Sequence, residues 1–484
     1  MEQLHRKTPL TLPVKAVQFG EGNFMRAFID WMIDEMNKKA GFGGCVQLIQ
    51  PRGGEKGQAL RDAINRQDGL YTLILRGVED GKVVEKSQII ESVKGCLDPV
   101  SEWQEICNVF CGKELRFFFS NTTDAGIEYK EEPYTPGKAQ GTFPAKLTAL
   151  LYARFSARLP GLILLPCELI EENGKKLKEI ILRYAAEWKL GDDYADYIRK
   201  ECIFCCTLVD RIVAGYPKME AESICAKAGY EDKLIDCGEP FHFFVIEAPD
   251  CVEQELPLCK AGINAVFVKD QTPYRTRKVR FLNGAHTATI PAAYLAGFDY
   301  VQEVMADPFF SKYVRTVLFE EVFPTVSLPD GEKKMFAEAV MERFQNPFAF
   351  HRLLSIALNS VSKWKIRVLP TLLDYLKLYG KLPKVLAFSL SALIAFYRNE
   401  NGIGSGRINV YPVNDTEGIA AWFEEQWKQY AAEPGILVKN VLGRTDFWGM
   451  DLNEVPGLTE TTEQNLKNIL ADGIRLATGG LFRD

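Results

Sequence analysis

Lys278, Asn283 and His286 lie within one short run that is otherwise mainly apolar, KVRFLNGAH. In an α-helix at about 100° per residue, Asn283 lies roughly 140° and His286 roughly 80° around the axis from Lys278, so all three fit on one broad face. A lysine in a partly dry site exchanges a proton near neutral pH, while amide and imidazole N–H groups donate to a developing alkoxide. This set suits carbonyl reduction without zinc.

A structural interpretation of the same residues stands beside the catalytic one. Lys278 would then extend its charge to water, Asn283 would cap a turn, and His286 would be a hydrogen-bonded core histidine. Only four histidines occur in the chain. The run also opens a helical region, next to where a cleft between two domains would lie. These observations favour catalysis.

The elements that must position this run follow from hydrophobic patterning. Compact apolar runs indicate strands at residues 14–19, 46–50, 71–75, 115–120 and 161–166, and helical patterns such as FMRAFIDWMIDEMNKKA alternate with them. Such alternation favours a parallel α/β sheet of the Rossmann type. CIFCCTLV and FHFFVIEA add strands that would extend the sheet in an antiparallel sense.

After residue 270 helical periodicity dominates. A helix is expected in EKKMFAEAVMERFQ, ending before Pro347, and a buried one in VLAFSLSALIAFY, which at 13 residues is shorter than the ~20 needed to span a bilayer. NGIGSG at 401–406 is typical of a loop between helices. We therefore place a domain boundary near residue 270, between an α/β domain at 1–270 and a mainly helical domain at 271–484.

A glycine turn, FGEGNF, follows the first strand and precedes a helix. Gly20 would permit the tight turn, and Gly22 would let backbone amides approach a pyrophosphate. The third glycine of the usual fingerprint is replaced by Met25, and a bare GxG is also typical of a turn without ligand. A second loop, SNTTDAGI, follows a later strand. The candidate cofactor-binding residues are Phe19, Gly20, Gly22, Asn23, Phe24, Arg52, Asn121 and Thr122.

The second strand ends Gln50-Pro51-Arg52, where an acidic residue would normally hold the ribose hydroxyls. Arg52 would instead accept a 2′-phosphate, so the residues leave the choice between NAD and NADP open.

Composition limits the partners. A formal net charge of −6 gives no electrostatic reason to expect nucleic acid or an anionic membrane. The twelve cysteines lack the paired spacing of a zinc site, so no metal is predicted and buried thiols in a reducing cytoplasm are the better interpretation. The N-terminal stretch lacks the features of a signal peptide. We expect a cytoplasmic protein with small-molecule partners. The sequence does not indicate an oligomeric state.

The chain resembles the polyol-specific long-chain dehydrogenases typified by mannitol 2-dehydrogenase. Their K-x4-N-x2-H signature is met by Lys278, Asn283 and His286, and the GxGNF turn, VDRI at 209–212, YLAG at 294–297 and MADP at 305–308 also match. PCELIEENG, FPAKL and ALNSVSKWKIRVLP are similar to the tagaturonate reductase (altronate oxidoreductase) branch. That resemblance implies a cytoplasmic NAD-dependent enzyme interconverting D-tagaturonate and D-altronate. It also implies an extended Rossmann-type NAD-binding domain at 1–270 and a mainly helical substrate and catalytic domain at 271–484, with the active site between the two domains.

One departure concerns the oxyanion hole. Polyol members carry a Ser-Cys-Asp-Asn motif whose asparagine is a second donor, but the matching segment here is Pro166-Cys167-Glu168-Leu169. Either Asn283 and His286 suffice, or another group such as Asn173 compensates.

A hexonate carboxylate needs a cationic, preferably forked partner. If the helix extends back through Tyr274, Arg275 lies about 60° from Lys278 on the catalytic arc. Polyol relatives typically carry Glu there. Lys363 is the second candidate, because the family places a lysine of that segment near the distal end of the substrate. Solvated or structural ion pairs would explain either residue equally well.

Rival functions remain open from the residues alone. The nearest are reductases of the same family acting on fructuronate/mannonate or on a polyol such as mannitol. A more distant one is a non-enzymatic nucleotide sensor, which would leave the Lys278, Asn283 and His286 face unexplained.

Overall fold

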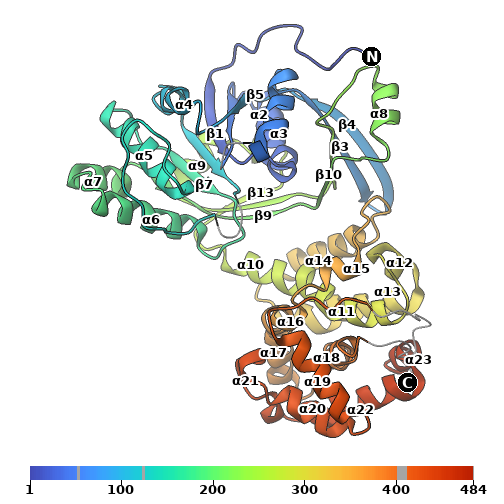
Figure 1. Ribbon diagram of the computed structural model, residues 1–484. Coiled ribbons are helices and arrows are strands. Elements are labelled where there is room, and N and C mark those ends of the chain that lie inside the picture. Colours follow the sequence, from blue (N-terminus) through green and yellow to red (C-terminus); the bar gives the residue numbers. More distant parts are fainter. Residues whose placement is uncertain (52–54, 123–125, 400–410, 483–484) are drawn as a thin grey trace. The chain divides into compact units, whose positions relative to one another are not determined.

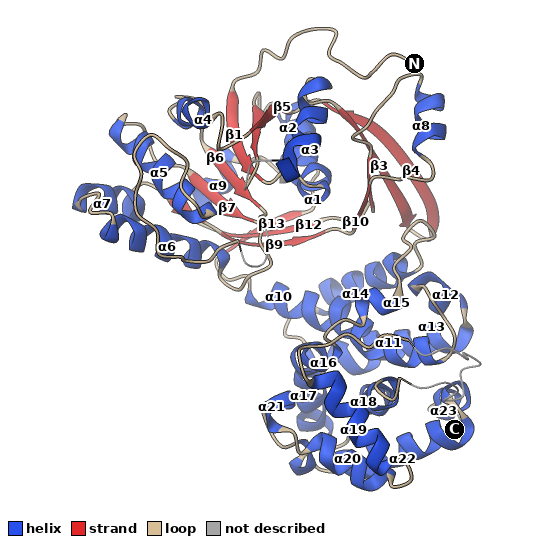
Figure 2. Ribbon diagram, in the orientation of Figure 1, coloured by secondary structure: helices blue, strands red, loops and turns tan. Residues whose placement is uncertain are grey.

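The computed structural model describes residues 1–51, 55–122, 126–399 and 411–482. The chain divides into two compact units, one of Met1–Glu79 and Val83–Gln271, the other of Asp80–Lys82 and Thr272–Asp484. Strands and helices mix in the first unit, and the second is built from helices (Figure 2). The predicted fold class, a Rossmann-type α/β domain followed by a mainly α-helical domain, is confirmed.

A six-stranded parallel sheet forms the centre of the first unit (Figure 1). Its strand order is β5-β2-β1-β6-β7-β8. The order runs outward in both directions from β1, so the neighbouring carboxyl ends of β1 and β6 are the switch point where doubly wound sheets bind ligands. The strands are β1 Val14–Phe19, β2 Cys45–Ile49, β5 Val93–Leu97, β6 Phe117–Ser120, β7 Ile163–Pro166 and β8 Ile203–Phe204.

Both faces of this sheet are covered. Along β1, Ala16 packs into one hydrophobic core and Val17 into another, as alternate side chains of a strand must. The first core takes in the helical segment that follows the glycine turn, and the second takes in α4 to α7. The helices of the unit are α1 Asn23–Met25, η1 Arg26–Asp30, α2 Trp31–Ala40, α3 Glu55–Arg66, α4 Trp103–Phe110, α5 Phe143–Ser156, α6 Asn173–Glu187, α7 Asp192–Lys200, α8 Ala221–Ala228, α9 Asp250–Glu255 and η2 Cys259–Ala261.

Two smaller sheets correct the expected strand arrangement. The run at 71–75 belongs to β3, in a four-stranded sheet of order β10-β11-β3-β4, and is not part of the parallel sheet. β9 and β12 do pair antiparallel, but in a separate three-stranded sheet of order β13-β12-β9. Apolar runs indicate strands but not which sheet they join. The strands are β3 Tyr71–Glu79, β4 Lys82–Ile90, β9 Cys206–Asp210, β10 Val213–Gly215, β11 Asp236–Gly238, β12 Phe243–Glu247 and β13 Ala265–Val268.

The second unit is organised around a buried helix. In α18 every residue from Val385 to Phe396 is buried, as its apolar run predicts, and α11 and α22 pack against it. α14 ends at Phe344, before Pro347, also as predicted. The segment 401–406 lies outside the described residues. The helices are α10 Thr272–Lys278, η3 Val279–Gly284, α11 Ala285–Leu295, α12 Val301–Ala306, α13 Pro308–Thr316, η4 Val317–Val322, η5 Phe323–Thr325, α14 Asp330–Phe344, α15 Leu353–Ile356, α16 Ser360–Arg367, α17 Leu369–Tyr379, α18 Lys384–Phe396, α19 Ile419–Tyr430, α20 Pro434–Leu442, α21 Thr445–Trp448, η6 Leu452–Glu454, α22 Leu458–Asp472 and α23 Ile474–Gly480.

Candidate active site

The glycine turn lies at the carboxyl end of β1. Gly20 has a φ of +117°, and a Cβ added there would lie 2.7 Å from the carbonyl oxygen of Asn121. Its N–H donates to Ile49 and its carbonyl accepts from the Gln18 amide, at 3.0 and 2.9 Å. Only glycine fits this backbone beside the loop after β6. The two loops that the sequence assigns to a cofactor therefore meet at the β1/β6 switch point.

Gly22 serves a different purpose. It precedes the first residue of α1 with a φ of −68°, so no left-handed conformation requires glycine. A Cβ added there would meet nothing within 4 Å. The start of the helical segment 23–40 is therefore open on this side, which fits the close approach of a pyrophosphate to backbone amides.

Three other cofactor candidates have structural side-chain roles. Phe19 is fully buried, and its ring packs 5.7 Å from that of Phe118, so only its backbone borders the turn. Phe24 stacks on Phe28 at 5.1 Å and packs against the core. Asn23 accepts a hydrogen bond from Arg26 through its side-chain oxygen. Arg52 lies outside the described residues.

The loop after β6 is held by a buried glutamate that the sequence did not indicate as functional. Glu168, only 2% exposed, accepts from the Ser120 hydroxyl at 3.0 Å and from the backbone N–H and hydroxyl of Thr122, both at 3.1 Å. The Asn121 amide donates to the carbonyl of Cys167 at 2.9 Å. Burial raises the pKa of Glu168. Ser120 to Thr122 are thus positioned by the end of β7.

Asn173 does not supply the missing oxyanion donor. Its side chain is fully buried and donates to the backbone carbonyls of Pro166, Glu168 and Thr207. Its oxygen accepts from the N–H groups of Gly174 and Thr207. These hydrogen bonds connect α6 to β7 and β9, so the side-chain amide of Asn173 is not available to a substrate. Leu169 is 62% exposed and has no polar side-chain atom to replace the asparagine.

The catalytic candidates of the second unit follow one another along a helical segment with an irregular middle. Lys278 ends α10, Asn283 lies in the π-helical stretch η3, and His286 lies in α11. The expected arc assumed a regular α-helix, so its angles do not apply across the wider turns of η3. A Cβ added at Gly284 would lie 3.0 Å from the carbonyl oxygen of Arg367, so this glycine lets α16 approach closely. Lys278 and Asn283 are partly exposed.

His286 lies in a dry, electropositive environment. Its ring stacks on Phe344 at a centroid distance of 4.0 Å, and it is 8% exposed. Nε2 has no hydrogen-bond partner among the residues described. Burial, assisted by His351 and the cations Arg343, Arg367 and Lys363, holds the pKa of His286 well below its usual range. The imidazole is therefore neutral at physiological pH and able to donate one N–H to an oxygen.

The basic residues near this segment differ in their surroundings. Arg280 binds the Thr325 carbonyl at 2.8 Å and Asp374 at 2.7 Å, and Arg277 lies over the Phe336 ring at 4.3 Å. Both are therefore structural. Lys363 donates to the carbonyl of Ile356 at 2.9 Å, and burial together with Arg367 lowers its pKa. Arg275 is partly buried in the last turn of α10.

All twelve cysteines are free thiols. Burial raises the pKa of Cys202 to about 11 and of Cys205 to about 12. No group of three or more potential metal ligands occurs among residues 1–51, 55–122, 126–399 and 411–482. Within the same ranges, no helix has both the length and the apolar character needed to cross a membrane.

The parallel sheet and the glycine turn at its switch point define a Rossmann-type domain, and the comparisons identify the family. Residues 14–260 match the mannitol dehydrogenase Rossmann domain, and 270–470 match the mannitol dehydrogenase C-terminal domain. The chain therefore belongs to the mannitol dehydrogenase family.

Its relatives include the altronate oxidoreductase of Bacillus subtilis (strain 168), 42% identical over 96% of this chain and 94% of that protein. The altronate oxidoreductase of Pectobacterium carotovorum subsp. carotovorum (strain PC1) is also 42% identical, over 97% of both chains.

Solved structures share the fold at lower identity. D-sorbitol dehydrogenase in substrate-free form matches with a TM-score of 0.81 at 20% identity, over 96% of this chain and 95% of that one. Pseudomonas fluorescens mannitol 2-dehydrogenase, solved with NAD and D-mannitol, matches with a TM-score of 0.70 at 20% identity, over 99% and 96% of the two chains. These solved structures therefore share the fold of this chain.

Proposed function

We propose that this protein interconverts D-tagaturonate and D-altronate, with NAD as its cofactor. The observation that carries the proposal is the 42% identity to altronate oxidoreductases over nearly the full length of both chains. Within a single enzyme family, such similarity supports a shared substrate class as well as a shared fold. It also favours an enzyme over the nucleotide-sensor interpretation.

The residues of the first unit fit a dinucleotide. Gly20 allows the tight turn after β1, and Gly22 leaves space beside the turn. The helix that begins at Asn23 presents its backbone N–H groups there. We infer that the backbone from Phe19 to Phe24 holds the pyrophosphate, and that Asn121 and Thr122 border the nicotinamide and its ribose. Arg52 is the candidate for the adenosine end. When bound, NADH supplies the hydride for reduction of the carbonyl carbon.

The residues of the second unit bind the substrate carbonyl oxygen and transfer a proton to it. Asn283 and His286 donate N–H groups to the substrate carbonyl oxygen and stabilise the negative charge that develops on it. Neutral His286 suits this role, because a protonated imidazolium would compete with the lysine for the proton-donor role. Lys278 gives its proton to the oxygen in reduction and takes it back in oxidation.

The substrate's carboxylate and distal hydroxyls require further contacts. We propose Arg275 for the carboxylate, because a guanidinium binds a carboxylate through two parallel hydrogen bonds. Lys363 is proposed for the distal end of the substrate. We also infer a cytoplasmic location, since the twelve cysteines are unpaired thiols of the kind that a reducing compartment preserves.

A substrate and coenzyme panel tests the proposal. Purified enzyme is assayed by NADH or NADPH oxidation with tagaturonate, fructuronate and fructose. We expect tagaturonate with NADH to give the highest kcat/KM. A higher kcat/KM with fructuronate or fructose would assign the chain to another substrate class of the same family. A preference for NADPH would make Arg52 the leading ligand of a 2′-phosphate.

A further inference from the structure

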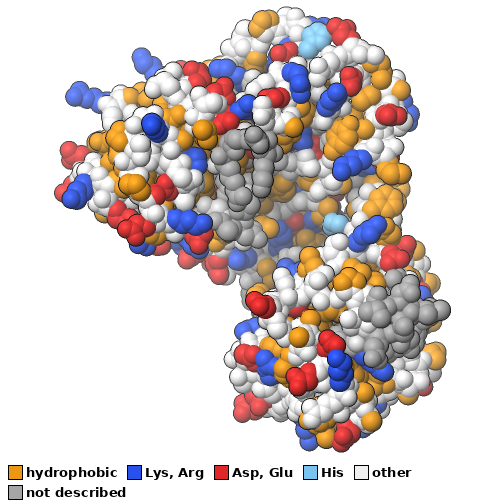
Figure 3. Space-filling model, in the orientation of Figure 1, with side chains coloured by type: hydrophobic (Ala, Val, Ile, Leu, Met, Phe, Trp, Pro, Cys, Tyr) orange, Lys and Arg blue, Asp and Glu red, His pale blue; other side chains and the backbone are white. Residues whose placement is uncertain are grey.

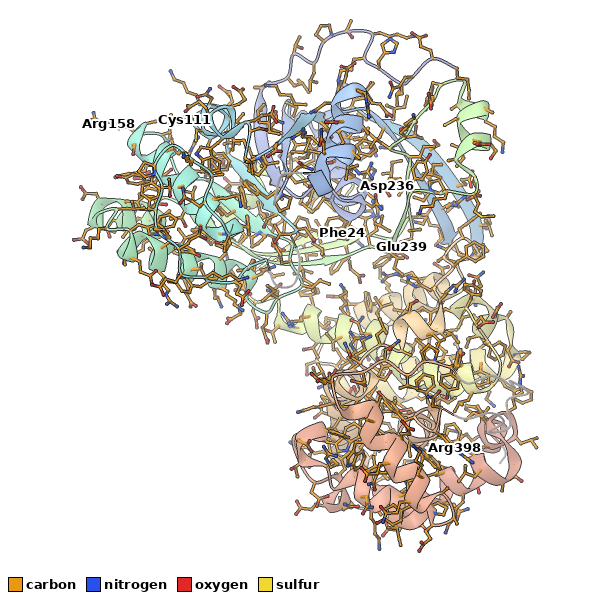
Figure 4. All side chains as sticks on the ribbon, in the orientation of Figure 1. Phe24, Cys111, Arg158, Asp236, Glu239 and Arg398 are labelled. Carbon is orange, nitrogen blue, oxygen red and sulfur yellow. The ribbon has the colours of Figure 1, made fainter. Side chains whose placement is uncertain are left out.

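A buried polar cluster lies behind the glycine turn and takes no part in the chemistry described so far. Its members are Gln18, Arg26, Asp30, Tyr71 and Asp236, none of them more than 2% exposed. Figure 4 labels Asp236, on β11, and Phe24, on the segment that follows the turn.

Arg26 connects the turn to the four-stranded sheet. One terminal nitrogen of its guanidinium donates to the Leu234 carbonyl at 2.8 Å, just before β11. The other donates to the side-chain oxygen of Asn23 at 2.5 Å and lies 3.9 Å from a carboxylate oxygen of Asp236 on β11. The guanidinium also lies over the Tyr71 ring at 5.3 Å.

Asn23 is held from a second side. Gly215, at the end of β10, has a φ of +80°, and a Cβ added there would lie 2.2 Å from the side-chain nitrogen of Asn23. The carboxamide is therefore packed directly on the Gly215 backbone while its oxygen is bound by Arg26. Both contacts act on the residue that opens the helix next to Gly22, so they restrict the conformation of the turn itself.

The stability of the fold does not explain this arrangement well. Arg26 Nε, both oxygens of Asp236, one of Asp30 and the Gln18 carbonyl oxygen lack hydrogen-bond partners among the residues described. Burying polar or charged groups without full hydrogen bonding is costly, and partly satisfied networks are commonly less stable than apolar packing. A cluster retained at this cost is expected to position something.

We propose that Arg26 is a positioning residue for the dinucleotide. Asp236 and the Leu234 carbonyl orient its guanidinium, and the guanidinium fixes Asn23 so that the turn from Gly20 to Asn23 is already in its binding conformation before the ligand arrives. Binding then requires less ordering of the loop, which improves affinity. Asp236 acts through Arg26 and is the second positioning residue.

A double-mutant cycle tests the connection between Arg26 and Asn23. NADH dissociation constants are measured by fluorescence for wild type, Arg26→Lys, Asn23→Ala and the double variant. Lysine keeps the charge but lacks the fork that reaches two acceptors at once. We expect each single variant to raise the Kd for NADH about tenfold. The Kd of the double variant should be no higher than the larger of the two single-variant values, as for residues that act through one contact.

Arg154→Lys is the matched control. Arg154 is also a buried arginine that binds backbone carbonyls, those of Phe110, Gly112, Leu115 and Pro160, but it does not contact the turn. Its substitution should lower Tm and leave the Kd for NADH unchanged. An Arg26→Lys variant that loses Tm to a similar extent but binds NADH normally would show a structural role only and overturn the proposal.

Asp236→Asn tests the same contact from the partner of Arg26 and can be used if Arg26→Lys fails to fold. The substitution preserves the side-chain volume. We expect a Kd for NADH raised threefold or more, with Tm unchanged or higher at pH 8. An unchanged Kd, or additive losses in the Arg26 and Asn23 cycle, would overturn the positioning role. Wild-type enzyme that binds no NADH would overturn the cofactor assignment and this inference together, whereas normal wild-type binding isolates the failure to Arg26.

Discussion

His286 differs from a fully hydrogen-bonded core histidine, and this difference is why we propose a catalytic role for it. A core histidine would have both ring nitrogens hydrogen-bonded, but Nε2 of His286 has no partner within the described part of the chain. The ring is instead aligned by stacking on Phe344. Burial, together with His351 and nearby cations, lowers the pKa of His286 and keeps the ring neutral. A donor nitrogen kept neutral and unpaired is what carbonyl polarisation requires.

We predict that Lys278→Ala slows hydride transfer roughly 10²-fold or more, the usual scale for loss of a general acid. In the proposed mechanism the lysine supplies the proton that neutralises the new alkoxide, so the variant's rate should also lose the pH dependence that this group imposes. Single-turnover NADH oxidation with tagaturonate, followed across pH, measures both. An unaltered rate and pH profile would remove Lys278 from this role.

Arg275→Ala is predicted to raise KM for tagaturonate roughly tenfold or more, because a charge-assisted hydrogen bond of ~1.5–3 kcal/mol is lost. Activity on a neutral ketose should change little. Arg280→Ala is the matched control, since its guanidinium is engaged by Thr325 and Asp374 and its loss should affect stability rather than KM. Equal losses on charged and neutral substrates would mean that Arg275 supports the catalytic helix and that the carboxylate is held elsewhere.

The helical segments that carry candidate residues in each unit share an irregularity. A π-helical stretch, η1, follows the glycine turn at Arg26–Asp30, and another, η3, spans Val279–Gly284 before His286. π-helical turns occur frequently at functional sites because they redirect side chains relative to a regular helix. In η1 the redirected residues include Arg26 and Asp30, and in η3 they include Asn283.

Asp30 in η1 provides a prediction about pH and stability. Burial raises its pKa to about 8, against the opposing effects of Arg26, Gln18 and Tyr71. An unfolded aspartate titrates near ~3.9, so between about pH 4 and 8 the folded state binds the proton more tightly. The contribution of Asp30 to the free energy of unfolding is therefore greatest below about pH 4 and is lost as pH rises towards 8.

Asp30→Asn removes this titration while keeping the side-chain size. We predict that its Tm relative to wild type increases between pH 5 and pH 8.5, by about 2 °C or more. Thermal unfolding of both proteins at the two pH values measures the difference. A Tm difference that is the same at both would show that Asp30 does not change its protonation over this range.

At the scale of the whole chain, both compact units are needed for the proposed reaction. The family match extends over 14–260 and 270–470, one range for each unit. The first unit carries the glycine turn, and the second carries the lysine, asparagine and histidine. Lys, Arg, Asp and Glu side chains are interspersed on the visible surfaces of the units (Figure 3), in keeping with a net charge of only −6.

We predict that prolonged dialysis against EDTA leaves kcat and KM unchanged. In the proposed mechanism, Lys278, Asn283 and His286 provide proton transfer and carbonyl polarisation, the functions that a metal ion would otherwise supply. Activity assays and elemental analysis before and after dialysis make the check. Loss of activity that zinc or manganese restores would contradict the metal-free mechanism.

Local sequence determined much of this protein. The Rossmann class, the helix ending before Pro347, the buried helix at Val385 and the turn at Gly20 follow from periodicity and backbone preferences, which act over a few residues. The candidate residues follow from motif spacing. The strand β4 escaped prediction because its side chains are mostly exposed, which leaves no continuous apolar run.

Tertiary structure alone decided which strands share a sheet and which polar groups are already engaged. Sheet membership depends on pairing between distant segments, so β3, β9 and β12 could be recognised as strands but not assigned. The side-chain amide of Asn173 is hydrogen-bonded to Pro166, Glu168 and Thr207. Arg26 contacts Leu234 and Asp236, which lie more than two hundred residues away in the sequence. Burial and hydrogen-bond partners are properties of the packed chain, and they separate a donor that is free for chemistry from one that supports the fold.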